Sequence, residues 1–408
     1  MRVTTLLPRL VPVASAIALA MLPTMTGAQE FEDVKVSQSL KIGGQGSFFV
    51  GGNTHQVDAP YAGQPGGSMI NQMYVQFQLP GDSSRKMFPI VFVHGCCLSS
   101  ATWQTTPDGR MGWAEYFLRK GFKTYMADQV GRARSGFDAL QYQKVRFDKN
   151  APPFTDQGGG AGCINPPVNS SGCEAPSTNG TTNPNILIAT DQFAWNVFRY
   201  GPPCTTPCGA FTSPPTIQPY ADQRFPMHTV LAGGTQTFFK QVIPDMTQTL
   251  GSFGPDPAVR TRPTPSRMAV LAKKLGGAIL VGHSQSSAFP TRAALQDPSG
   301  VKGIIQLETG CFANLTAPEI EILKKIPILI MEGDHYVQAD GVTPQVKPPA
   351  ACVTQMAQIN GAGGNMTYIH LPAIGIFGNS HMFMQDNNNL AIADILIKWI
   401  DKNVKFKK

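Results

Sequence analysis

A serine between an apolar run and a helix-compatible run is the first residue whose type and position could do chemistry. The segment AILVGHSQSS places Ser284 directly after the apolar residues and before a run that continues to Asp297. A tight turn there would lift the hydroxyl above the edge of a sheet, as in the nucleophile elbow G-x-S-x-G. Position 286 departs from that motif, because it is serine where the second glycine is usual. We predict that Ser284 is the nucleophile of an acyl-transfer reaction.

A serine hydroxyl needs a base to take its proton at neutral pH, and three histidines follow Ser284 in the chain. His370 lies inside the strand-like segment MTYIHLP, where a packed histidine is the simpler interpretation. His335 follows directly after Asp334 at the end of a predicted strand, which is early for a base in the chain order serine, acid, histidine. His381 lies in the loop GNSHM between the last predicted strand and the last predicted helix. This position favours His381 as the base.

Two carboxylates are candidates for the acid that would orient the base. Asp334 ends the apolar segment PILIMEGD, and Glu308 ends the preceding segment in QLETG. A carboxylate at either place could hold the imidazole tautomer and stabilise its charge. The other carboxylate would then cap a loop, and the spacing does not choose between the two.

A transition state with a developing oxyanion also needs N–H donors, and the stretch FVHGCCLSS is the expected source of one of them. The N–H of Gln285 follows the nucleophile, and the loop at residues 94–97 follows an earlier strand. Neighbouring Cα atoms lie about 3.8 Å apart across a trans peptide, whereas disulfides usually span roughly 4.4–6.8 Å. A bridge between Cys96 and Cys97 would thus close a strained, rigid ring, and the alternative is two free buried thiols.

Several apolar segments followed by helix-compatible patterns must position these residues. The predicted strands lie at residues 88–95, 278–284, 301–308, 327–334 and 366–372, with helices at about 112–121 and 390–404. Continuous apolar strands that alternate with helices indicate a parallel sheet covered on both faces. The pattern breaks at about residues 139–262, where Pro, Gly, Asn and four cysteines are followed by aromatic residues. We expect this insertion to form an ordered cap above the strand ends.

The first residues resemble a secretory signal peptide. Arg2 and Arg9 precede an apolar run that ends in small residues, so cleavage is expected near Ala28, leaving residues 29–408 without a membrane span. Removal of the two arginines lowers the net charge from +7 to +5. So small an excess, without a Lys/Arg run, gives no case for nucleic acid.

Eight cysteines in an exported chain indicate disulfides rather than metal ligands, because the compartment is oxidising. Proximity along the chain suggests four pairs, which are Cys96 with Cys97, Cys163 with Cys173, Cys204 with Cys208, and Cys311 with Cys352. Of the seven histidines, only His94 lies near a cysteine pair, so no metal and no cofactor are expected.

Taken together, the motifs HGCC, DQVGRARS, GHSQS, LETG, GDH and GNSHMFMQDNNN resemble a small group of secreted bacterial carboxylesterases of the α/β-hydrolase fold. The resemblance covers roughly residues 88–135 and 278–400. It implies Ser284 as nucleophile, His381 as base and Glu308 as acid. It also implies an oxyanion hole formed by Cys96 and Gln285, with Cys96 joined to Cys97. The chain departs from the group at Ser287 and at Thr309, where glycine and proline are expected.

The sequence therefore predicts a secreted serine carboxylesterase that acts through an acyl-enzyme on a small or polymeric ester. An amidase with the same triad is the first alternative, and a hydrolase-fold module that only binds is the second. Trp103, beside the oxyanion loop, is a candidate for an apolar substrate pocket. Neither the natural ester nor the oligomeric state can be read from the sequence.

Overall fold

The computed structural model describes most of the region in which the sequence predicts a parallel sheet. The described residues are 39–57, 64–81, 86–137, 189–204, 208–212, 215–244, 263–308, 311–312, 314–338 and 341–405. The predicted signal peptide, both ends of the predicted cap insertion, and Cys163 and Cys173 lie outside these ranges. No helix within them is long and apolar enough to cross a membrane.

One mostly parallel sheet runs through the described residues, and it has eight strands there in the order β1-β2-β4-β3-β6-β7-β8-β9. The strands are β1 (Ile42–Val57), β2 (Gly66–Pro80), β3 (Ile90–Val93), β4 (Thr124–Ala127), β6 (Ala278–His283), β7 (Val301–Leu307), β8 (Ile328–Glu332) and β9 (Met366–His370). Strand β2 is antiparallel to both of its neighbours, and all pairs from β4 to β9 are parallel. The carboxyl ends of β3, β6, β7 and β8 therefore meet at one edge of the sheet.

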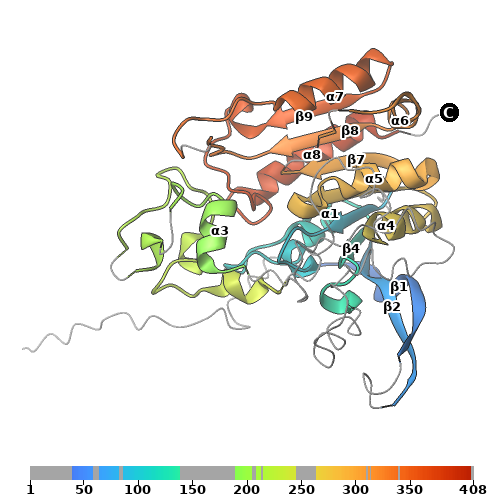
Figure 1. Cartoon of the computed structure of the whole chain (residues 1–408), viewed down its shortest axis with the longest axis horizontal. Coiled ribbons are helices and arrows are strands. Elements are labelled where there is room, and N and C mark those ends of the chain that lie inside the picture. Colours follow the sequence, from blue (N-terminus) through green and yellow to red (C-terminus); the bar gives the residue numbers. More distant parts are fainter. Residues whose placement is uncertain are drawn as a thin grey trace, which may run out of the picture.

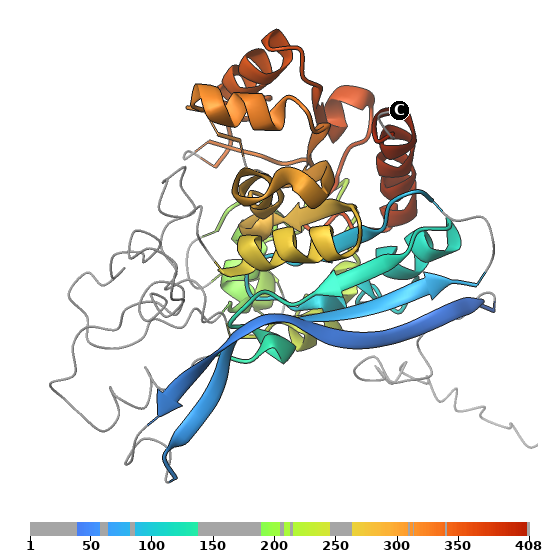
Figure 2. The ribbon, with the colours of Figure 1, turned by 90° about the vertical axis from the view of Figure 1, so that its right-hand side faces the viewer.

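Helices cover both faces of this sheet (Figures 1 and 2). The helices are α1 (Trp113–Arg119), α4 (Pro263–Lys274), α5 (Phe289–Gln296), α6 (Ala317–Leu323), α7 (Ala350–Gly361) and α8 (Asn389–Asn403). Ile90 and Phe92 of β3 pack on the side of α1 and α8, whereas Val91 and Val93 pack on the side of α4 to α7. This alternation explains why the strand sequence is apolar at every position, and it confirms the predicted parallel sheet with two helical layers.

Short sequence signals determine which face of a helix is buried and where a helix begins. Helix α8 buries a stripe that includes Ile392, Leu396 and Ile400, which recur at the spacing of one helical face. Helix α6 begins with a capping box, in which the side chains of Thr316 and Glu319 satisfy backbone N–H groups in both directions. These signals place the helices against the sheet and leave the carboxyl edge to the connecting loops.

The described part of the insertion packs onto the face that carries α1 and α8. It contains α3 (Asp191–Val197) and three short 3-10 segments, at Gly209–Phe211, Met227–Thr229 and Thr237–Gln241. Phe198, Tyr200, Phe225 and Phe238 are buried in one aromatic cluster that is continuous with the core of that face. Figure 1 shows α3 in green beside the sheet, at the edge toward which the loop before α8 also extends.

Candidate functional site

The carboxyl edge of the sheet carries the serine and the glutamate that the sequence singled out, and the histidine contacts the glutamate there. Ser284 follows the last residue of β6 and Glu308 follows the last residue of β7. Both adopt left-handed backbone conformations, with φ of 54° and 64°. Such conformations cost energy in residues other than glycine and cluster at functional sites.

Ser284 stands at the tight turn that the elbow motif predicts. A Cβ atom at Gly282 would overlap the backbone of Ser286 and lie 2.9 Å from Pro290 Cδ, so only glycine fits there. Ser286 Oγ accepts a hydrogen bond from the N–H of His283 at 3.0 Å and lies 3.0 Å from the carbonyl oxygen of Val93. The serine at position 286 therefore ties the elbow to β3, a link that a second glycine could not make.

His381 and Glu308 form a buried pair. His381 Nδ1 lies 2.8 Å from Glu308 Oε2, and the glutamate side chain is completely buried. The same oxygen accepts hydrogen bonds from Arg199 Nη2 at 2.7 Å and from the Tyr336 hydroxyl at 2.5 Å. The other oxygen accepts the N–H of Gly333 at 2.7 Å. The carboxylate is thus held by four donors, close to its full capacity.

These contacts set the charge of each group. Burial alone would raise the pKa of Glu308, but the charge of Arg199 and the contacts with His381 and Tyr336 hold it well below its usual range. Burial lowers the pKa of His381, and Arg199 lowers it further, against the opposing effect of Glu308. Nε2 of His381 makes no hydrogen bond with any described residue. A carboxylate and a neutral imidazole with Nδ1–H toward Glu308 are the states that this arrangement favours.

The loop after β3 lies directly against the elbow. A Cβ atom at Gly95 would lie 2.8 Å from Ser284 Cβ and 3.1 Å from the carbonyl oxygen of His283. Arg132, which is buried, donates from Nη1 to the carbonyl of Gly95 at 2.8 Å and from Nη2 to Gln285 Oε1 at 2.9 Å. One guanidinium therefore joins the backbone of the loop to the side chain of the residue after Ser284.

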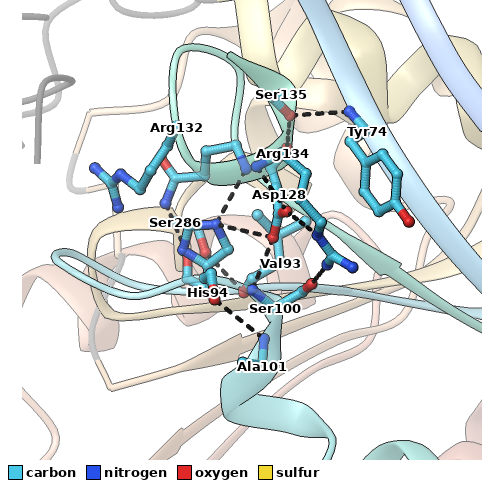
Figure 3. Close-up of polar contacts among 12 residues, drawn as sticks. Tyr74, Val93, His94, Ser100, Ala101, Asp128, Arg132, Arg134, Ser135 and Ser286 are labelled. Atoms are coloured by element: carbon cyan, nitrogen blue, oxygen red, sulfur yellow. Dashed lines mark hydrogen bonds and ion pairs between the residues drawn. The ribbon is translucent and has the colours of Figure 1, made fainter. Parts of the chain in front are cut away.

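A further set of polar contacts, several of them drawn in Figure 3, supports this loop. His94 Nε2 accepts the N–H of Gln129 at 3.1 Å, and Gln129 Nε2 donates to the carbonyl of His94 at 2.7 Å. Asp128 accepts the N–H of Ser100 at 2.8 Å and Nε–H of Arg134 at 2.7 Å. Burial alone would raise the pKa of Asp128, but these partners hold it below its ordinary value, so it stays charged.

The chain is similar to known proteins over most of its length. A solved structure described as "The Atomic Resolution Structure of a Novel Bacterial Esterase" is 33% identical in sequence, with a TM-score of 0.69, and the match covers 91% of this chain and 99% of that one. The chain belongs to the α/β-hydrolase esterases. A "Probable secreted lipase phiG" from Fungal sp. (strain ATCC 74256) is 24% identical, over 81% of this chain and 86% of the relative. No protein-family model matches the chain. The predicted fold is confirmed, and the protein is a hydrolase that acts on esters.

His283, the residue before Ser284, also contacts this site, although no sequence pattern predicted it. His283 Nε2 donates to the carbonyl oxygen of His381 at 2.8 Å. Burial lowers the pKa of His283 to about 3, so its ring is neutral at neutral pH. His283 therefore anchors the backbone of the loop that carries His381.

Two residues of the insertion reach the same histidine. The ring of Phe198 stacks on the imidazole of His381, with centroids 5.5 Å apart and an interplanar angle of 18°, and its carbonyl accepts the N–H of His381 at 3.0 Å. The next residue, Arg199, contacts Glu308 as described above. The sequence shows aromatic residues in this insertion, but it did not predict Arg199, because a single arginine there carries no pattern.

Three of the predicted cysteine pairs lie at disulfide-bonding distance. The Cα atoms of Cys96 and Cys97 are 3.8 Å apart, those of Cys204 and Cys208 are 5.4 Å apart, and those of Cys311 and Cys352 are 5.0 Å apart. None of the cysteines in the described ranges is free. Cys96 and Cys97 also form a small apolar cluster with Ala189, against which Phe193 and Val242 pack. The insertion thus contacts the loop after β3 as well as His381.

The residues that competed for the acid and base have other contacts. Asp334 accepts the N–H groups of His335 at 2.6 Å and of Gly378 at 2.9 Å, so it caps the loop that leads to His381. His335 stacks on Tyr220 with centroids 3.8 Å apart. These contacts match the loop-capping alternative for Asp334.

Asp334 and His335, together with Asp222, also offer three potential metal-ligand atoms within 4.8 Å of one another. His335 Nε2 lies 3.0 Å from Asp222 Oδ1, and both Asp334 oxygens already accept backbone N–H groups. These contacts indicate that the three side chains stabilise the surrounding loops.

The other two residues that the sequence raised make different contacts, and the ring of Trp103 lies 6.3 Å from that of His283. His370 is the last residue of β9, and its pKa is lowered, chiefly by burial. Trp103 is completely buried and packs on Phe92 and Trp113, with centroids 5.0 and 5.8 Å away. Core packing leaves no part of the Trp103 side chain accessible here, and the substrate contact expected for it stays a prediction.

Proposed function

We propose that the chain is a secreted serine carboxylesterase that needs no cofactor, with Ser284 as nucleophile, His381 as base and Glu308 as acid. The buried pair of His381 Nδ1 and Glu308 Oε2, 2.8 Å apart, carries this proposal. The hydrogen bond from His283 to the carbonyl of His381 supports it, because it fixes the histidine loop to the residue that precedes Ser284.

In the first half of the reaction, His381 Nε2 takes the proton of Ser284 Oγ while Oγ attacks the ester carbonyl carbon. Glu308 accepts Nδ1–H throughout and stabilises the imidazolium that forms. When the tetrahedral intermediate collapses, the bond to the alcohol oxygen breaks and His381 Nε2 gives the proton to the leaving alcohol. Ser284 is left as an acyl ester.

Water completes the cycle. His381 Nε2 takes a proton from the water as its oxygen attacks the acyl carbon, and a second tetrahedral intermediate forms. Its collapse breaks the bond to Ser284 Oγ, which regains a proton from His381, and the carboxylic acid leaves. No metal, redox or carrier chemistry is needed to balance either half.

The N–H groups of Cys96 and Gln285 are the proposed oxyanion donors. Loss of one such donor costs about 3–4 kcal/mol of transition-state stabilisation in measured cases. Three features support a fixed direction for these N–H groups, namely the adjacent Cys96–Cys97 pair, the close approach of Gly95 to Ser284, and the bridge that Arg132 makes from Gly95 to Gln285.

Two further parts of the proposal concern substrate and location. The apolar cluster of Cys96, Cys97 and Ala189, with Phe193 and Val242 against it, favours an apolar group on the ester. The signal-like residues 1–28 and the relative named a secreted lipase support export, with cleavage near Ala28. We further propose that the insertion at about residues 139–262 is the cap over the site.

The test compares Ser284→Ala with Ser299→Ala, which alters an exposed serine near the end of α5. Ser284→Ala should lose several powers of ten in kcat and all labelling by a serine-directed phosphonate, whereas the control should keep both. Ester hydrolysis should exceed hydrolysis of the matched amide, and a panel of acyl lengths, aromatic acids and polyesters would define the substrate. Residual turnover above about one hundredth of the parent rate would show that another residue is the nucleophile.

A further inference from the structure

The strongest unexplained feature near the site is an arginine that the insertion contributes. We propose that Arg199 is a positioning residue that balances the charge of Glu308 and thereby keeps His381 neutral and able to accept a proton. This inference rests on the triad proposed above. It concerns a residue 109 positions away from Glu308 in the chain.

The guanidinium of Arg199 is fixed at both ends of its fork. Nη2 donates to Glu308 Oε2 at 2.7 Å, and Nε donates to the carbonyl of Asp334 at 2.7 Å. The backbone is held as well, because Gln223 Nε2 donates to the carbonyl of Arg199 at 2.9 Å. Arg199 has a left-handed φ of 57° and its side chain is only 10% exposed. A side chain held at this many points has one orientation, which is the condition for placing a charge accurately.

Arg199 is the cation that pairs with Glu308, because the other buried cation nearby pairs with a different carboxylate. Lys347 is the other buried cation nearby, but its Nζ lies 2.7 Å from Glu332 Oε2 and pairs with that carboxylate. The ring of Tyr336 packs between the two cations, 3.9 Å from Arg199 Cζ and 3.3 Å from Lys347 Nζ. Each buried carboxylate thus has its own cation, and Tyr336 separates the two pairs.

This charge balance bears directly on the base. A buried carboxylate without a cation favours a proton on its histidine partner, and a protonated histidine cannot take the proton of a serine. Arg199 Nη1 also lies 3.1 Å from His381 Nδ1. Since Nδ1–H is directed at Glu308, the guanidinium acts on the imidazole through its charge and opposes protonation at rest.

Several other charged or titratable groups lie near His381 and remain unchanged in the two Arg199 variants. They are His283 at the end of β6, Asp334 and Tyr336 after β8, Glu332 on β8, Lys347 before α7, Tyr200 in the insertion and Asp386 in the loop after His381. Among the described groups that contact Glu308, only Arg199 brings a permanent positive charge.

The experiment measures kcat/KM against pH for Arg199→Gln, Arg199→Lys and Tyr336→Phe, with Arg224→Gln as the control. Arg224 is an exposed arginine of the same insertion that donates to the carbonyl of Phe377. In Arg199→Gln the pKa of His381 should rise. The acid limb of the kcat/KM profile should therefore move to higher pH by roughly one unit. Arg199→Lys should keep the limb within about 0.3 units of the parent while its plateau falls, because a point charge replaces the fork.

Tyr336→Phe removes a donor to Glu308 but no positive charge, so its acid limb should stay close to that of the parent. Phosphonate labelling of Ser284 in each variant shows whether the nucleophile still reacts. An unmoved limb in folded Arg199→Gln, or a limb in Arg199→Lys displaced as far as one unit, overturns the role of Arg199 and leaves the triad standing. An active, phosphonate-reactive Ser284→Ala protein overturns the triad itself, whichever way the arginine variants behave.

Discussion

His283 Nε2 donates to the carbonyl oxygen of His381 at 2.8 Å, although 98 positions separate the two residues. The residue before the proposed nucleophile therefore holds the backbone of the proposed base. Phe198 holds the same residue from the other side, through ring stacking and a hydrogen bond to the backbone N–H. Two separate parts of the chain thus hold the backbone of His381. During turnover we expect only its imidazole and the protons on it to change position.

The two candidate acids can be separated by Glu308→Gln and Asp334→Asn, which each delete one charge with little change in shape. Glu308→Gln should lose about 10³ to 10⁴ in kcat, because the imidazole loses its charge partner and its tautomer. Asp334→Asn should lose far less in kcat, since the carboxylate oxygens of Asp334 accept backbone N–H groups of His335 and Gly378. Rates with a soluble ester and melting curves of both variants test this. The opposite ranking would assign the acid to Asp334.

Opening the bridge between Cys96 and Cys97 should affect catalysis more than stability. A two-residue loop removes little entropy from the unfolded chain, so Cys96→Ala/Cys97→Ala should melt within a few degrees of the parent. It should lose about tenfold or more in kcat, on the scale of a partly misdirected oxyanion donor.

Cys204→Ala/Cys208→Ala is the matched control for that variant, because it opens a bridge within the insertion and should leave kcat nearly unchanged. Peptide mapping without reduction should find the parent fragment that holds Cys96 and Cys97 two hydrogens lighter than the dithiol. Two free thiols there, or an unaltered kcat in the first variant, would contradict the catalytic role of the pair.

The close approach of Gly95 to Ser284 can be tested with one substitution and one matched control. In Gly95→Ala the new Cβ would lie 2.8 Å from Ser284 Cβ, closer than side chains approach, so the loop must move away from Ser284. We expect a loss of about 10² to 10³ in kcat, as for the loss of one oxyanion donor. Gly361→Ala places a Cβ in open space at the end of α7 and should leave kcat unchanged. Equal rates for the two variants would show that the loop does not need this contact.

The sequence predicted the parts of the site that follow from strand ends. Apolar runs identify β6 and the turn after it, which is enough to select Ser284, and the loop before α8 selects His381. It could not choose between Glu308 and Asp334, because both follow neighbouring strands and differ only in long-range partners. The contact of Asp334 with Gly378 spans 44 positions, and no local pattern encodes it.

Long-range contacts also explain what the sequence could not show about Arg199 and Trp103. Arg199 lies in an insertion without helix or strand periodicity, and its partner Glu308 is on another element. The substrate contact predicted for Trp103 rests on its nearness in the chain to residues 94–97, whereas the sequence does not show that its ring packs on Phe92. Proximity in sequence does not give the direction of a side chain, which packing around the sheet decides.

The contribution of Phe198 and Arg199 from the insertion limits how this enzyme can be re-engineered. A chimera that exchanged residues 189–204 for the corresponding segment of another hydrolase would change part of the proposed cap and remove two supports of His381 and Glu308 together. Substrate range and working pH would then change in one step. Grafts that retain Phe198 and Arg199 while varying the rest of the segment are the ones that could alter selectivity alone.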